Sequence, residues 1–152
     1  MKMKLKGRLK CSGILKIELD NEVELPLHAS LIKNQKMHIT LVHQSLMKEM
    51  TFSGKRLDKW LSKNQPDIEL ELELNTTEPF ICKEPEKQSQ VFFVTEDSQH
   101  SLDAFLKLYF DSLGLTKEFK EIKANSIDTG RRYHLSYANL TGNPGDSVAV
   151  VW

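Results

Sequence analysis

The chain has few of the residues that hold small secreted proteins together, and neither sign of charge is in excess. Its 152 residues include only two cysteines, Cys11 and Cys82, which exclude a disulfide framework and form no CxxC pair. Lysine and arginine (21) balance aspartate and glutamate (21), which argues against a protein that coats long DNA or RNA. No apolar run approaches the roughly 18 residues of a membrane span, and the basic N-terminus lacks the apolar stretch of a secretory signal. We therefore expect a cytoplasmic protein without a membrane partner, in which a local patch can still bind a small nucleotide.

The composition is that of an ordinary globular protein. Hydrophobic residues make up 39% of the chain and charged residues 28%, which is too apolar for disorder. No repeat, low-complexity tract or glycine/serine linker divides the sequence. We expect one domain over residues 1–152.

Hydrophobic periodicity predicts an α+β domain. Alternation or β-rich composition predicts strands over residues 3–9, 15–20, 36–42, 68–74, 90–95, 132–139 and 147–152, with a short strand near 80–81. Spacings of three and four residues predict helices over 44–50, 57–63, 98–113 and 116–124. Strands and helices interleave without regular βαβ alternation, and there is no glycine-rich phosphate loop. This pattern indicates an α+β domain of antiparallel sheets with flanking helices and not a doubly wound parallel sheet.

The basic run near the N-terminus has an explanation that needs no ligand. Residues 3–9 and 15–20 predict a β-hairpin whose register would place Lys6 opposite Glu18 and Lys4 opposite Asp20. Such cross-strand charge pairs are mutually stabilising. The alternative is a surface that faces phosphate groups.

Four of the five histidines begin the pattern His-x-Ser/Thr-hydrophobic, at His28, His38, His43 and His134. On a strand, residues i and i+2 share a face, so an imidazole and a hydroxyl would project side by side. His38 with Thr40 and His134 with Ser136 lie in predicted strands whose other face is apolar. His43 falls where a strand gives way to a helix, and the segment around His28 is ambiguous. We therefore predict His38 and His134 as the pair, with His28 or His43 as the alternative to His38.

Two imidazoles and two hydroxyls are suited to acid–base chemistry on a phosphodiester. One neutral imidazole can accept a proton from water or a ribose hydroxyl, and a protonated one can give a proton to the leaving oxygen. The hydroxyls of Thr40 and Ser136 can donate hydrogen bonds to the non-bridging phosphate oxygens. The scheme needs no cofactor and no metal, and the sequence has neither HExxH nor a Cys/His ligand cluster that would indicate zinc.

The two signatures, His38-Ile39-Thr40-Leu41 and His134-Leu135-Ser136-Tyr137, resemble those of the 2H (LigT-like) phosphoesterase superfamily. The tail from Tyr133 to Ser147 is similar to the C-terminal signature of its compact bacteriophage branch, which includes the anti-CBASS phosphodiesterase. The resemblance implies a two-lobed fold with one signature in each lobe, facing across a cleft. It implies metal-independent cleavage of cyclic phosphates or phosphodiesters in RNA and nucleotides, in the host cytoplasm if the protein is phage-encoded.

Three functions remain open at this point. The first is a phosphodiesterase that opens a cyclic di- or trinucleotide messenger. The second is an enzyme acting on RNA ends, at 2′,3′-cyclic phosphates or 2′-5′ linkages. The third is a non-catalytic protein that sequesters a nucleotide. The balanced charge and small size favour a small nucleotide substrate over long RNA.

Overall fold

The computed structural model describes residues 2–11, 14–20, 24–47, 49–52, 54–63, 65–75, 80–84, 87–129 and 132–143. The strands are β1 (Lys2–Cys11), β2 (Leu15–Leu19), β3 (Ile32–Val42), β4 (Thr51–Phe52), β5 (Lys55–Arg56), β6 (Asp67–Glu73), β7 (Phe80–Glu84), β8 (Lys87–Phe93) and β9 (His134–Asn139). The helices are α1 (Gln44–Met47), α2 (Leu57–Leu61), α3 (Glu96–Ser112) and α4 (Thr116–Thr129). The strand predicted over residues 147–152 lies outside the described residues.

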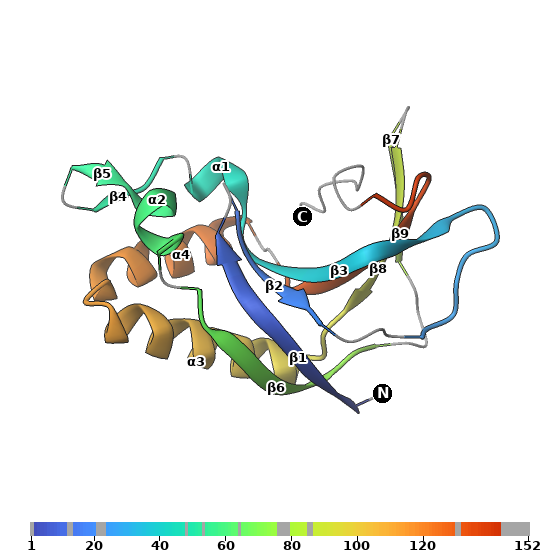
Figure 1. Cartoon of the computed structure of the whole chain (residues 1–152), viewed down its shortest axis with the longest axis horizontal. Helices are drawn as coiled ribbons and strands as arrows, with labels where there is room; N and C mark the ends of the chain where they lie inside the picture. The colour runs from blue at the N-terminus through green and yellow to red at the C-terminus, as the bar shows by residue number, and fades with distance from the viewer. Residues whose placement is uncertain are drawn as a thin grey trace.

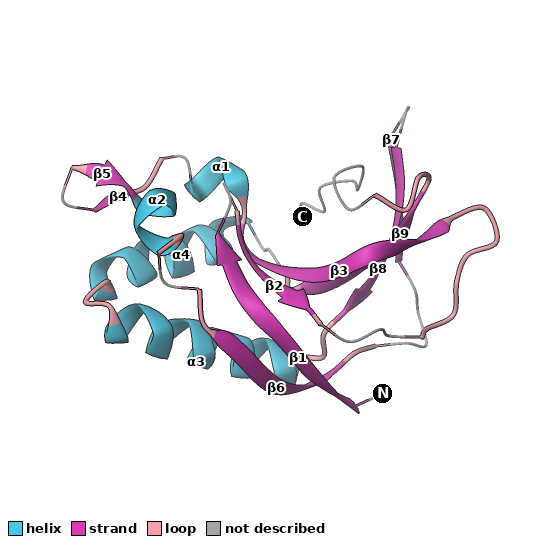
Figure 2. Cartoon of the chain, in the orientation of Figure 1, coloured by secondary structure: helices cyan, strands magenta, loops and turns pink. Residues whose placement is uncertain are grey.

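One curled antiparallel sheet forms most of the molecule (Figure 1). Its seven strands have the order β6-β1-β2-β3-β9-β8-β7, and β4 and β5 form a separate two-stranded hairpin. The helices gather at one end of the molecule and along one side of the sheet (Figure 2). The predicted α+β class with antiparallel strands and flanking helices is confirmed.

One face of this sheet carries a continuous apolar row. Directly opposed positions on five neighbouring strands are occupied by Leu9, Ile17, Ile39, Leu135 and Phe92. Each of these side chains is at most 2% exposed. Because successive residues of a strand point to opposite faces, the residues on either side of each row member face the other way.

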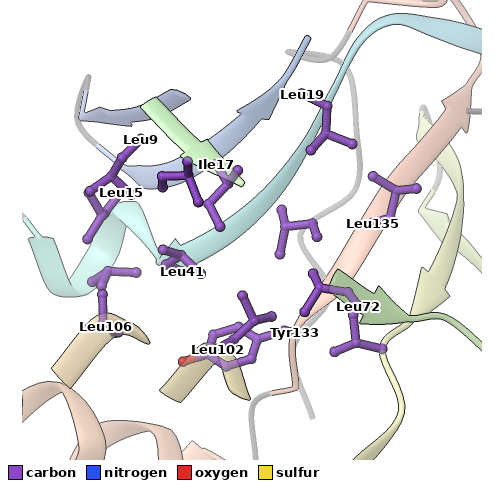
Figure 3. Packing of buried hydrophobic residues seen from close by; sticks show 14 of the residues in the cluster. Leu9, Leu15, Ile17, Leu19, Leu41, Leu72, Leu102, Leu106, Tyr133 and Leu135 are labelled. Carbon is purple, nitrogen blue, oxygen red and sulfur yellow. The ribbon is translucent and has the colours of Figure 1, made fainter. Parts of the chain in front are cut away.

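Helix α3 covers the apolar face. Its buried residues include Leu102, Leu106 and Phe110, which recur every four positions and join the same core cluster as the sheet row. Figure 3 shows Leu102 and Leu106 packed against side chains of the sheet. The helix stops just before Gly114, whose φ of 74° is a backbone conformation that glycine adopts without strain. The other face of the sheet points away from α3.

Helices in the described part of the chain are too short or too polar to cross a membrane.

One sequence prediction about strand placement is wrong. The sequence predicts His38 and His134 on different sheets or lobes, but their strands, β3 and β9, are hydrogen-bonded neighbours in one sheet. The final described strand, β9, lies in the middle of this sheet, between β3 and β8.

The predicted hairpin of β1 and β2 is present, but its register differs by two residues. Arg8 lies opposite Glu18, while Lys4 and Lys6 lie opposite Glu71 and Glu69 of β6. The basic run is thus paired with acidic positions, as its ligand-free explanation requires, although most of its partners belong to β6. Periodicity could not reveal these partners because a shift of two residues keeps every side chain on the same face.

Candidate active site

The four predicted site residues lie together on the face of β3 and β9 that points away from α3. One row of opposed positions crosses five strands through Arg8, Glu18, His38, Ser136 and Val91. In the next row Lys10 lies opposite Lys16, Lys16 opposite Thr40, and His134 opposite Phe93. Continuing the β3–β9 register by one residue from the Ile39–Leu135 pair brings Thr40 opposite His134.

These four side chains form a quadrilateral, which we call the His/hydroxyl square. His38 is directly opposite Ser136, so His134, two residues before Ser136, is the diagonal neighbour of His38. The two histidines therefore occupy one diagonal, and the hydroxyls of Thr40 and Ser136 occupy the other. Diagonal neighbours in an antiparallel pair are separated by about 7–8 Å. A tetrahedral phosphate above the centre could meet an imidazole on either side and a hydroxyl at each remaining corner.

His38 is held in the neutral state. It is 9% exposed. Burial, followed by the positive charge of Lys16 and the neighbouring His134, lowers the pKa of His38 to about 4, while Glu18 opposes the shift. At neutral pH its imidazole therefore has an unprotonated ring nitrogen, which a general base requires.

The depressed pKa of His38 should make the protein less stable in acid. Above pH 6.5 the imidazole is neutral in both the folded and the unfolded chain. Between pH 6.5 and about 4 only the unfolded chain takes up the proton, so the stability contributed by the neutral imidazole is lost as pH falls. A shift of this size corresponds to about 3 kcal/mol over the whole window.

Urea unfolding of the wild type and His38→Gln at pH 7 and pH 4.5 isolates this contribution. The variant should lose about 2–3 kcal/mol less than the wild type between the two pH values, since carboxylate titration is common to both proteins. Equal losses in the two proteins would show that His38 is not desolvated as described.

His134 is oriented by the backbone of its own strand. Its Nδ1 lies 3.1 Å from the carbonyl oxygen of Arg132. A carbonyl oxygen can only accept a hydrogen bond, so Nδ1 carries a proton and Nε2 is the nitrogen left to exchange one. The ring is partly exposed, and it meets Phe93 edge-on with ring centroids 5.9 Å apart. His134 is thus the more accessible of the two imidazoles.

Side chains of α3 form hydrogen bonds with Tyr133, the residue directly before His134. The Gln99 side chain accepts the backbone N–H of Tyr133 at 2.9 Å and donates to its carbonyl at 3.0 Å. One turn further along α3, Asp103 accepts the Tyr133 hydroxyl at 2.7 Å. The sequence does not reveal the roles of Gln99 and Asp103, because nothing in their spacing shows that α3 contacts the start of β9.

Asn34 provides a second support that sequence reasoning missed. The pairing of β3 with β9 shifts register between Lys33 and His38, and Asn34 lies within this irregularity. Its Nδ2 donates to the backbone carbonyl of Ser136 at 3.1 Å. Asn34 is buried, at 3% exposed. Its side chain supplies a hydrogen bond to β9 where the backbone ladder is interrupted.

The other two histidines of the repeated pattern lie outside the square. His28 is in the segment between β2 and β3, where its Nδ1 accepts the Ser30 backbone N–H at 3.3 Å and lies 2.8 Å from the Ser30 hydroxyl. His43 follows the end of β3 and precedes α1. Of the three N-terminal copies, His38 is the one that the structure pairs with β9.

Among the described residues, no group of three or more His, Cys, Asp and Glu side chains is arranged to hold a metal ion. Comparison with family models, curated proteins and solved structures gives no match to this chain.

Proposed function

We propose that this protein is a phosphodiesterase of the 2H (LigT-like) type that hydrolyses a cyclic nucleotide or cyclic oligonucleotide signal. The observation that carries the proposal is the His/hydroxyl square, in which two His-x-Ser/Thr segments nearly 100 residues apart meet on the sheet face opposite α3. The α+β fold by itself does not support this family over others, because curled antiparallel sheets with helices on one side occur in many unrelated proteins.

His38 is suited to act as the general base. Its neutral imidazole can accept a proton from the attacking water as the new P–O bond forms. Lys16, directly opposite Thr40, adds positive charge beside the square and favours approach of an anionic substrate.

His134 is suited to act as the general acid. With Nδ1 bound to the Arg132 carbonyl, a protonated His134 can release its second proton from Nε2 to the leaving ribose oxygen as the old P–O bond breaks. Thr40 and Ser136 would donate hydrogen bonds to the two non-bridging oxygens, where negative charge develops. The cycle ends with His38 protonated and His134 neutral, and proton exchange with solvent restores both.

The biological role that we propose is counter-defence by a bacteriophage in the host cytoplasm, by destruction of a cyclic-nucleotide alarm signal. Its support is the sequence resemblance to the phage branch together with the balanced charge, which suits a small nucleotide better than long RNA.

The test is a turnover assay with purified protein on cyclic di- and trinucleotides and on RNA ends bearing 2′,3′-cyclic phosphate or 2′-5′ linkages, with EDTA present. Hydrolysis of the cyclic oligonucleotides is the expected result. Selective cleavage of the RNA ends would show that the protein is an RNA-end enzyme instead. Tight binding without turnover would indicate a sequestering protein, and activity lost in EDTA but restored by Zn²⁺ or Mn²⁺ would contradict the metal-free mechanism.

Thr40→Ala and Ser136→Ala should each lower kcat by about 10- to 100-fold, because each removes one hydrogen bond to a non-bridging oxygen. Ser30→Ala is the matched control, since it removes a hydroxyl beside His28 and should leave turnover unchanged. Steady-state kinetics on the best substrate of the panel provide the measurement. Wild-type rates in both site variants would exclude the two hydroxyls from the mechanism.

A further inference from the structure

Two buried apolar side chains, Phe93 and Val91, border the His/hydroxyl square on its β8 side. Phe93 is directly opposite His134, and Val91 is directly opposite Ser136. These two apolar residues form a cluster of their own, separate from the main core, as expected for side chains on the opposite face of the sheet. The square is therefore bordered by two buried apolar side chains on the strand next to its second histidine.

Arg132 lies over this aromatic border. Its guanidinium carbon is 4.4 Å from the centroid of the Phe93 ring, and the residue is exposed. Its backbone carbonyl also binds His134 Nδ1. The stacking contact holds the guanidinium on the Phe93 ring, and the same ring meets the His134 imidazole edge-on.

The β2 and β1 side of the square has a different character. Lys16 and Lys10 lie there in the same row as Thr40, and both approach Glu18, at 3.8 Å and 2.9 Å. A nucleotide has the same two characters, since its phosphates are anionic and its base is a flat π-system. The two borders of the square therefore match the two ends of one substrate.

We propose that Arg132, supported by Phe93, forms a nucleobase subsite, so that the base attached to the reacting ribose stacks on the guanidinium while the phosphates point toward β2. This inference rests on the proposed function and specifies how its substrate lies on the sheet. Guanidinium planes and aromatic rings stack on every base, so the subsite should bind nucleotides with little base preference.

Binding of AMP and of ribose 5-phosphate tests the subsite without any need for turnover. The wild type should bind AMP about 10- to 100-fold more tightly than ribose 5-phosphate, the range that stacking on one base provides. Arg132→Lys keeps the charge and the carbonyl that holds His134 but loses the planar group, so it should weaken AMP and leave ribose 5-phosphate unchanged. Arg8→Lys makes the same exchange on β1, on the far side of the square, and should weaken neither ligand.

Equal affinity of the wild type for the two ligands, or no binding of either, would overturn the subsite. So would an equal loss for both ligands in Arg132→Lys. Phe93→Leu supplies a second variant, which should reduce the preference for AMP because Arg132 loses its support. If the preference for AMP depends on Arg132 but no nucleotide in the turnover panel is cleaved, the subsite stands and the catalytic proposal fails.

Discussion

Replacing His38 or His134 with alanine should lower turnover by about 100-fold or more, the scale of a lost general acid or base. The His38→Ala substitution removes the neutral imidazole that accepts the proton. The His134→Ala substitution removes the group that protonates the leaving oxygen. Each loss corresponds to at least about 2.7 kcal/mol of transition-state stabilisation. The double variant should be little worse than either single one, because the two groups serve one reaction step.

His28→Ala and His43→Ala are the matched controls, because both histidines belong to the same sequence pattern but neither lies on a strand paired with β9. Both should stay near the wild-type rate in the same assay, with circular dichroism confirming that every variant is folded. Loss of activity in His28→Ala with a normal rate in His38→Ala would show that the wrong copy of the pattern has been assigned to the site.

The rate of hydrolysis should have a two-sided pH profile that persists in EDTA. Since the base must be neutral, activity should rise with pH through an acid limb near pH 4, set by His38. Since the acid must be protonated, activity should fall at higher pH as His134 loses its proton. The sequence alone would place the profile around the reference value of 6.5, so the depressed pKa of His38 widens the profile on its acid side.

Lys16→Gln provides a direct control on the acid limb. The positive charge of Lys16 helps to depress the pKa of His38, so its removal should move this limb to higher pH while the alkaline limb stays in place. Measurements of kcat/KM from pH 3.5 to 9, limited to the range where the protein stays folded, provide the test. An acid limb that remains near 6.5 in the wild type would contradict the burial of a neutral base.

Alternation along the chain was sufficient to predict which face each site residue occupies. His38 and Thr40 alternate with Met37, Ile39 and Leu41, and this pattern requires a strand with one face in the core. The same reasoning holds for His134 and Ser136. The helix α3 was equally clear, because its apolar residues recur at helical spacings and Gly114 follows them.

The pairing of strands and the supports of the site could not be predicted in the same way. Periodicity fixes the face of a strand but says nothing about its neighbour, so the insertion of β9 beside β3 was missed. Gln99 and Asn34 make their hydrogen bonds across large distances in sequence, and the irregularity that places Asn34 has no local signature. The sequence predicted that basic residues of β1 lie opposite acidic residues, but it did not predict that these acidic residues belong to β6.

The central position of β9 has a consequence for the order of folding. Asn34 and Ser136, which bond across the β3–β9 boundary, are 102 positions apart in the sequence. A contact of this separation closes a large loop, which makes it costly in entropy and slow to form. During synthesis β3 and β8 emerge from the ribosome before β9 and must leave its place between them open. The nascent chain therefore has no assembled His/hydroxyl square until its last described strand has docked.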